Sequence, residues 1–256
     1  MVDIHSHILP GIDDGPESCE VSAEMCRLAA ADGITHIVTT PHCNDHYWYD
    51  RGAQYEALEK LREATGPTMG FSLGCEFQAS YENLQDLIGN PDNYTIADTR
   101  YLLTELSDLS VSPNLKLTLS QIRFEGIVPI IAHPERHPIL QRKPEIVLEW
   151  IEVGCLVQVT ANALTGYWGV RPRKVAAWLL KNGGVHFLAS DAHDPVHRTP
   201  LMSQARQAAA AIVGEEQARF LVEDNPRAVV LGVHLPSAPP AGFAFRTFVE
   251  RESIAG

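Results

Sequence analysis

The chain has 256 residues, with 20 Lys and Arg against 32 Asp and Glu, giving a formal net charge of −12. Its 45% hydrophobic and 20% charged residues are typical of a packed globular protein and exclude a disordered or fibrous chain. The negative charge argues against nucleic acid and anionic membranes as partners, because both attract proteins that carry a positive field.

Short apolar runs alternate with helical patterns along the chain. The apolar runs predict strands over residues 2–5, 34–40, 71–75, 101–106, 127–132, 155–160 and 185–190. The helical patterns cover residues 16–32, 50–64, 114–125, 145–153, 173–182, 200–213, 215–223 and 226–231, with Pro16 expected in the first turn of its helix. Because most strands are separated by a helix, we expect an α/β fold with a parallel sheet, either open or closed into a barrel.

The remaining sequence features bear on organisation and compartment. We expect one domain over residues 1–235, followed by a Pro-rich linker and C-terminal tail over 236–256. The five cysteines form no CxxC pair, which is typical of a reduced cytoplasmic protein. The N-terminus does not read as a signal peptide, and no apolar run approaches the roughly 18–20 residues of a membrane span. The oligomeric state is left open.

Metal-type side chains follow six of the predicted strands at their carboxyl ends. They are His5, His7, Asp14, His42, Glu76, Glu105, His133, Asp191 and His193. In parallel α/β folds, active sites assemble at this face. So many imidazoles and carboxylates on one rim would repel one another or be stranded without cations. Mixed nitrogen and oxygen donors suit Mn, Fe or Zn, and the set is too large for one ion, so it predicts two or three divalent metals.

Two arginines lie in loops on the same side of the predicted sheet. Arg136 lies three residues after His133, and Arg198 lies five residues after His193. Guanidinium groups bind phosphate oxygens in bidentate fashion and stabilise charge in phosphoryl transfer. The alternative is that each arginine pairs with an acidic neighbour. Together with the metal-type set, the arginines favour a phosphoester substrate and are the predicted catalytic residues.

Six motifs follow one another along the chain: HSHILPGIDDG, TTPH, GCEF, LLTEL, IAHPERH and LASDAH. They occur in the order found in the PHP (polymerase and histidinol phosphatase) superfamily, which the chain resembles from residue 1 to about residue 232. Within it, HSHILPGIDDG, HPER and the Arg after SDAH resemble the bacterial manganese-dependent protein tyrosine phosphatases of capsule and exopolysaccharide clusters. The resemblance implies a distorted (β/α)7 barrel and phosphate binding by Arg136 and Arg198. The implied sets for three metals are His5, His7, Glu76 and Asp191; Glu76, Glu105 and His133; and Asp14, His42 and His193.

The resemblance also implies hydrolysis of a phosphotyrosyl protein, with a bacterial tyrosine autokinase as the implied partner. No cysteine is followed six residues later by an arginine, which argues against a cysteinyl-phosphate route. We therefore expect a metal-activated hydroxide to attack phosphorus directly. Two alternatives remain open: a PHP phosphatase for a small phosphomonoester such as histidinol phosphate or a nucleotide, and a non-catalytic metal-binding regulator.

Overall fold

The computed structural model of the chain describes residues 1–107 and 111–236, so the predicted tail beyond residue 236 lies outside the described residues. Parallel strands form two hydrogen-bonded sheets. In order, the first contains β1 (Val2–Ser6), β2 (His36–Thr39) and β4 (Gly70–Leu73). The second contains β3 (His42–Cys43), β5 (Glu76–Gln78), β6 (Tyr101–Glu105), β7 (Val128–Ala132), β8 (Leu156–Thr160) and β9 (Phe187–Ala189). A strand lies at each predicted position, which confirms the parallel α/β prediction.

The two sheets are continuous, because β2 leads into β3 and β4 leads into β5. A two-residue break separates each pair. Pro41, in the first break, has no N–H group and cannot donate to a strand ladder. The Gly74 N–H donates to the Thr39 carbonyl at 2.9 Å, and the Glu76 N–H donates to the Pro41 carbonyl at 3.0 Å. The strand paths therefore run on across both breaks.

The ring of strands closes between β9 and β1. Ser6 and Ala192 form a parallel bridge, and the Asp191 N–H donates to the His5 carbonyl at 2.8 Å. With β2 joined to β3 and β4 joined to β5, the nine strands make seven strand paths. This arrangement is the expected distorted (β/α)7 barrel.

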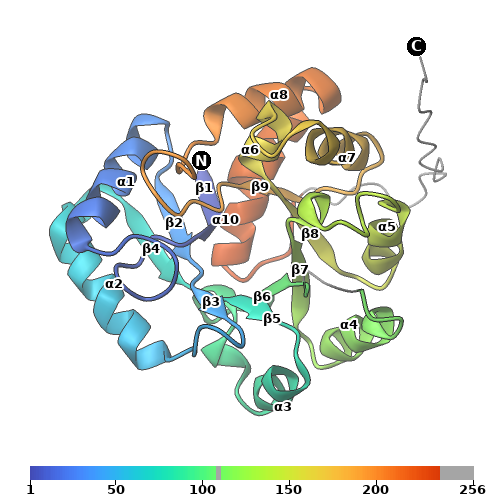
Figure 1. The fold of residues 1–256 in the computed structure, drawn as a ribbon, viewed down its shortest axis with the longest axis horizontal. Helices are drawn as coiled ribbons and strands as arrows, with labels where there is room; N and C mark the ends of the chain where they lie inside the picture. The colour runs from blue at the N-terminus through green and yellow to red at the C-terminus, as the bar shows by residue number, and fades with distance from the viewer. Residues whose placement is uncertain (108–110, 237–256) are drawn as a thin grey trace.

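Helices follow the strands and surround the ring (Figure 1). They are α1 (Cys19–Ala31), α2 (Arg51–Thr65), α3 (Tyr81–Gly89), α4 (Leu115–Phe124), α5 (Glu145–Glu152), α6 (Ala161–Thr165), α7 (Val170–Lys181), α8 (Ser203–Val213), α9 (Glu215–Arg219) and α10 (Asn225–Val230). Short 3-10 turns lie at Gly66–Thr68, Pro91–Asn93, Ile96–Asp98 and Pro134–Arg136, and a π-helical turn lies at Phe220–Asp224. The sequence pattern does not predict α3 or α6.

The start of α1 differs from the expectation. The helix begins at Cys19, with Ser18 as its extended N-cap residue, so the placement of Pro16 in the first turn is wrong. The Pro16 carbonyl instead accepts a hydrogen bond from the Gly11 N–H at 2.8 Å, which closes the loop after β1. That loop carries Asp14.

The amino ends of the strands are covered by α10. Val229 of this helix packs with Val2 and Ile4 of β1 in one buried apolar cluster. The Tyr101 hydroxyl, at the start of β6, donates to the Val233 carbonyl just beyond α10 at 2.6 Å. This packing closes one end of the barrel, so the loops at the carboxyl ends form the open face.

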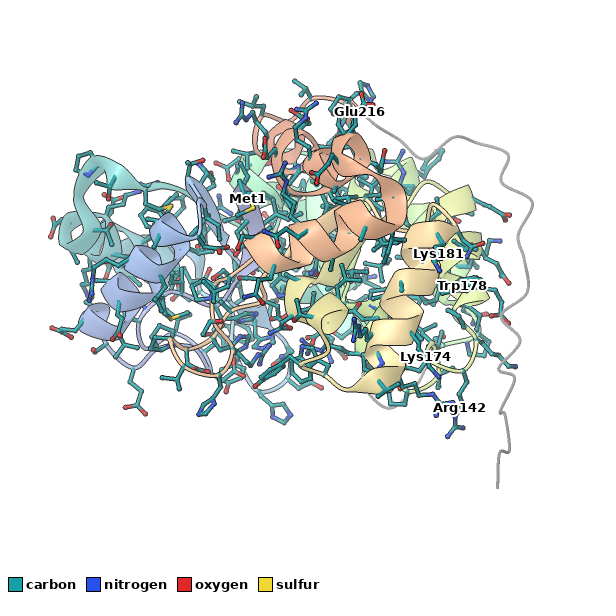
Figure 2. The ribbon with its side chains drawn as sticks, turned by 90° about the horizontal axis from the view of Figure 1, so that it is seen from above. Met1, Arg142, Lys174, Trp178, Lys181 and Glu216 are labelled. Carbon is teal, nitrogen blue, oxygen red and sulfur yellow. The ribbon has the colours of Figure 1, made fainter. Side chains whose placement is uncertain are left out.

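Figure 2 shows the barrel from a direction perpendicular to that of Figure 1. Met1, which precedes β1, lies on the upper side, whereas Arg142 after β7 and Lys174 near the start of α7 lie on the lower side. From Lys174, α7 runs toward the upper side at Lys181 and so returns the chain toward the amino ends of the strands. Among the described residues, no helix is long and apolar enough to cross a membrane.

Candidate active site

The structure brings all nine predicted metal-type side chains together at the open face of the barrel. In each of three groups the ligand atoms lie within 4.8 Å of one another: His7, Asp14, His42 and His193; His5, His7 and Glu76; and His42, Glu76 and Glu105. The other two side chains adjoin these groups. His133 Nε2 lies 2.6 Å from Glu76 Oε1, and Asp191 Oδ1 lies 3.3 Å from His5 Nε2. These groups overlap more than the implied sets, which share only Glu76, because His7, His42 and Glu76 each belong to two of the groups.

Two of the nine residues do not lie at the strand ends where the sequence reading placed them. His42 is the first residue of β3, and Glu76 is the first residue of β5. They are paired in register between these strands. The reason is the break before each of these strands, after which the extended chain resumes. The pairing places the His42 and Glu76 side chains next to each other in the middle of the cluster.

Backbone conformation directs two further side chains into the cluster. His133 follows β7 with a φ of 32°, and Asp191 follows β9 with a φ of 52°. Left-handed backbone is unfavourable for residues other than glycine and persists where the surrounding structure enforces it. Here it turns the chain sharply at the strand ends.

The donor atoms of the cluster fit divalent cations. His5 Nε2 and His7 Nε2 lie only 3.2 Å apart; Glu76 Oε1 lies 3.3 Å from the first, and Glu76 Oε2 lies 3.2 Å from the second. His42 Nδ1 and His193 Nε2 are buried without a hydrogen bond of good geometry, although carboxylate oxygens lie 3.0 Å and 3.3 Å away. Nitrogen and oxygen atoms that converge in this way without hydrogen-bond geometry are typical of metal ligands.

The pKa values in the cluster reflect the crowding of its charges. Burial and the charge of Glu76 raise the pKa of Glu105 to about 8. Burial and the charge of Arg136 lower the pKa of His133 to about 4. Burial opposes the protonated form of His7 and His42, but carboxylates outweigh it and raise the pKa to about 9 and about 11. A bound cation would displace these protons and favour the ionised form of Glu105. The crowding of carboxylates therefore fits a site for cations.

Two residues that the sequence analysis missed orient the histidines. Asp13 Oδ2 lies 2.7 Å from His7 Nδ1, and Gln158 Oε1 lies 3.0 Å from His5 Nδ1. A proton on Nδ1 leaves the Nε2 lone pair of each ring facing the cluster. The signals were weak: Asp13 is the neighbour of Asp14, and Gln158 is the polar residue within the apolar strand CLVQVT.

Both predicted arginines bind one carboxylate of the cluster. Asp191 Oδ2 accepts a hydrogen bond from Arg136 Nη1 and another from Arg198 Nη2, the latter at 2.7 Å. The alternative in which each arginine pairs with an acidic neighbour is thus realised. The shared neighbour is a member of the metal-type cluster, so the pairing keeps both guanidinium groups at the site.

Comparisons with known proteins agree with this arrangement. Residues 1–231 match the family described as "Capsular polysaccharide synthesis, CpsB/CapC". The chain is 32% identical over 209 residues to a putative tyrosine-protein phosphatase CapC from Staphylococcus aureus, covering 80% of this chain and 81% of that protein. It is 31% identical over 228 residues to the tyrosine-protein phosphatase YwqE from Bacillus subtilis, covering 88% of this chain and 89% of that protein.

A solved structure extends the similarity to three dimensions. It superposes with a TM-score of 0.87 at 30% identity, covering 94% of this chain and 98% of the other. It is one of the crystal structures of YwqE from Bacillus subtilis and CpsB from Streptococcus pneumoniae, which are described as unique metal-dependent tyrosine phosphatases. The similarity therefore spans nearly the whole of both chains.

Proposed function

The chain belongs to the CpsB/CapC family of capsular polysaccharide synthesis, and on this basis we propose that it is a metal-dependent protein tyrosine phosphatase. One observation carries the proposal. Asp191 contacts the imidazole cluster through Oδ1 and binds both arginines through Oδ2. A cation site and a phosphate site thus share one carboxylate, which places both next to one phosphate and suits metal-assisted hydrolysis of a phosphomonoester.

In this proposal the nine clustered side chains hold two or three divalent cations, for which Mn is our candidate. They are His5, His7, Asp14, His42, Glu76, Glu105, His133, Asp191 and His193. When bound, the cations supply an activated water as the nucleophile and neutralise charge on the phosphate. Asp13 and Gln158 keep the imidazole rings of His7 and His5 in the ligating tautomer.

Arg136 and Arg198 bind and orient the phosphate. Their side chains are 23% and 22% exposed, so a substrate can reach both guanidinium groups. When phosphate binds, the N–H groups of each arginine that donate to Asp191 Oδ2 donate instead to the phosphate oxygens, on which negative charge builds. A tyrosyl leaving group has a pKa of about 10, so it departs as phenolate with little help from a general acid.

The thiols take no part in this chemistry. All five cysteines are unpaired, and burial raises the pKa of both Cys26 and Cys155 to about 12. A nucleophilic cysteine needs a lowered pKa and a neighbouring phosphate-binding loop. The reaction accordingly proceeds without a cysteinyl-phosphate intermediate.

The finer assignments rest on the same reasoning. The partner is a phosphotyrosyl protein, for which a bacterial tyrosine autokinase of polysaccharide synthesis is our candidate. Unpaired thiols and a kinase partner support a cytoplasmic location. Residues 1–235 form the catalytic domain, and residues 236–256 are an appended linker and tail. The Asp14 side chain is 43% exposed, which supports a site open to a protein segment.

This proposal is tested by comparing the hydrolysis of three phosphate esters. Manganese-loaded protein is assayed with a phosphotyrosyl peptide, the same peptide bearing phosphoserine, and histidinol phosphate. We expect kcat/KM to be highest for the phosphotyrosyl peptide. Much faster turnover of histidinol phosphate would instead support the small-molecule phosphatase, and no turnover of any ester would support the non-catalytic regulator.

A further inference from the structure

Trp168, in the loop between α6 and α7, contacts both site arginines. Its ring centroid is 4.4 Å from the guanidinium carbon of Arg136 and 5.6 Å from that of Arg198. Both distances fall within the range of cation–π attraction, about 6 Å. The indole N–H donates to Asn162 Oδ1 of α6 at 2.7 Å, which fixes the orientation of the ring. One aromatic side chain therefore contacts both guanidinium groups.

The contact of Trp168 with the arginines uses a different part of each guanidinium group from the contact with Asp191. The N–H groups of a guanidinium lie in its plane, so Asp191 Oδ2 occupies donors that a phosphate also needs. An aromatic ring that attracts the positive charge of the group occupies no N–H donor. Trp168 can thus keep Arg136 and Arg198 in place while their N–H groups pass to the phosphate.

A cavity of about 270 Å³ adjoins the same tryptophan. Its lining includes His133 and Arg136, which belong to the site, and the apolar side chains of Leu106, Trp168 and Pro172. His137 and Gln141 also line the cavity, so polar groups next to the site and apolar side chains both face it. Such a cavity suits a flat apolar group that carries its phosphate at one end.

We propose that Trp168 positions Arg136 and Arg198 for phosphate binding and forms a wall of the cavity that takes the phenyl ring of the substrate. The second part rests on the proposed function, because it assumes a phosphotyrosyl substrate. The first part concerns phosphate alone. Phosphoserine has no ring to place against Trp168 and Pro172, so the cavity favours the aromatic ester over the aliphatic one.

The test separates the two parts by using inorganic phosphate as well as peptides. Binding of phosphate to manganese-loaded protein is measured by calorimetry for wild type, Trp168→Ala and Trp168→Phe. We expect roughly tenfold weaker phosphate binding in Trp168→Ala and recovery to within about threefold in Trp168→Phe, which keeps an aromatic face. The ratio of kcat/KM for phosphotyrosyl over phosphoseryl peptide should fall roughly tenfold in Trp168→Ala, mainly through KM for the phosphotyrosyl peptide.

Two further variants make the result interpretable. Trp48→Ala removes a tryptophan that is 93% exposed and has no arginine contact among the interactions of the described residues, so it should change neither quantity. Asn162→Ala keeps the indole but removes its hydrogen bond, and should weaken phosphate binding less than Trp168→Ala. Asn162→Ala also tests the positioning role should Trp168→Ala fail to fold. Melting temperature and metal content are compared throughout.

Each outcome has a definite meaning. Unchanged phosphate binding in folded, metal-replete Trp168→Ala overturns the positioning role. Weaker phosphate binding with an unchanged peptide ratio supports positioning and overturns the ring-binding role. Wild-type protein that binds phosphate in a Trp168-dependent manner but hydrolyses no phosphotyrosyl peptide refutes the proposed function and leaves the positioning role standing.

Discussion

Arg198 Nη2 donates to Asp191 Oδ2 at 2.7 Å, while the other oxygen of the same carboxylate, Oδ1, lies 3.3 Å from His5 Nε2. Burial opposes the negative charge of Asp191, but Arg136, His5 and Arg198 outweigh it and hold the pKa of the carboxyl well below its usual range. An ionised carboxylate thus links the imidazole cluster to both arginines, which bind the phosphate in our proposal. In our proposal Asp191 therefore divides the site into a cation side and a phosphate side.

Removing either arginine should impair turnover without emptying the cation side. For Arg136→Ala and for Arg198→Ala we expect kcat to fall roughly 10²–10³-fold, because each loses a donor to the charge that develops in the transition state. Metal content, measured by plasma mass spectrometry, should stay near the wild-type value. Arg136→Lys is the matched control for charge, and it should not restore turnover, since an ammonium cannot replace the planar fork. Metal loss that parallels the loss of turnover would contradict this division.

Asp13→Asn should weaken metal binding although Asp13 is not among the nine clustered residues. The amide cannot hold the proton on His7 Nδ1 as firmly as the carboxylate that now lies 2.7 Å away. We expect metal affinity to fall by about 10–100-fold, as is usual for the partner of a ligating histidine. Competition with a fluorescent chelator gives the affinity. Asp45→Asn, an exposed acid in the loop after β3, is the control and should bind metal like wild type. Equal metal affinities of Asp13→Asn and Asp45→Asn would show that Asp13 does not support metal binding.

Sequence periodicity could predict the strands and the rim residues because these depend on local patterns. Alternation and β-branched runs mark the strands, and the carboxyl ends of parallel strands meet wherever the barrel closes. The contact of Trp168 with Arg136 could not be predicted, because it joins two loops whose conformations depend on the whole fold. The helix α3 was missed for a different reason. Its nine residues, YENLQDLIG, are too few for a clear periodicity, although Leu84, Leu87 and Ile88 have helical spacing and the Ser80 side chain accepts from the Asn83 N–H at 3.2 Å.

Thiol modification should leave activity intact. Cys19 is half-buried, whereas the other four cysteines are buried. A disulfide reagent should therefore titrate one thiol in the native protein and five in denaturant. Phosphotyrosine hydrolysis after modification should match that of untreated protein and of Cys19→Ser. The account would be contradicted if activity fell in proportion to modification of the native thiol and if Cys19→Ser prevented that loss.

Stability should fall below pH 6.5 because of a histidine remote from the cluster. His186 is buried before β9, where Nδ1 accepts from the Val157 N–H at 3.1 Å, and burial lowers its pKa from 6.5 to about 4. The unfolded chain binds this proton more tightly than the folded chain. The free energy of unfolding should therefore decrease as the pH falls from 6.5 to 4, by roughly 3 kcal/mol from this group.

The variant His186→Asn keeps an acceptor near the Val157 N–H and does not titrate in this range. Urea unfolding of chelator-treated protein at pH 7 and pH 4.5 gives the dependence for both proteins, without interference from metal release. We expect a smaller loss of stability in the variant. An equal loss would show that His186 does not contribute.

The most direct test of the central claim is phosphate release from a phosphotyrosyl peptide by protein stripped of metal with a chelator, before and after Mn²⁺ is returned. The account predicts that stripping abolishes hydrolysis and that Mn²⁺ restores it at least roughly 10²-fold, because the nucleophile and part of the charge stabilisation depend on the cations. Asp191→Asn, treated in the same way, should not recover. Hydrolysis that survives complete removal of metal would contradict the account.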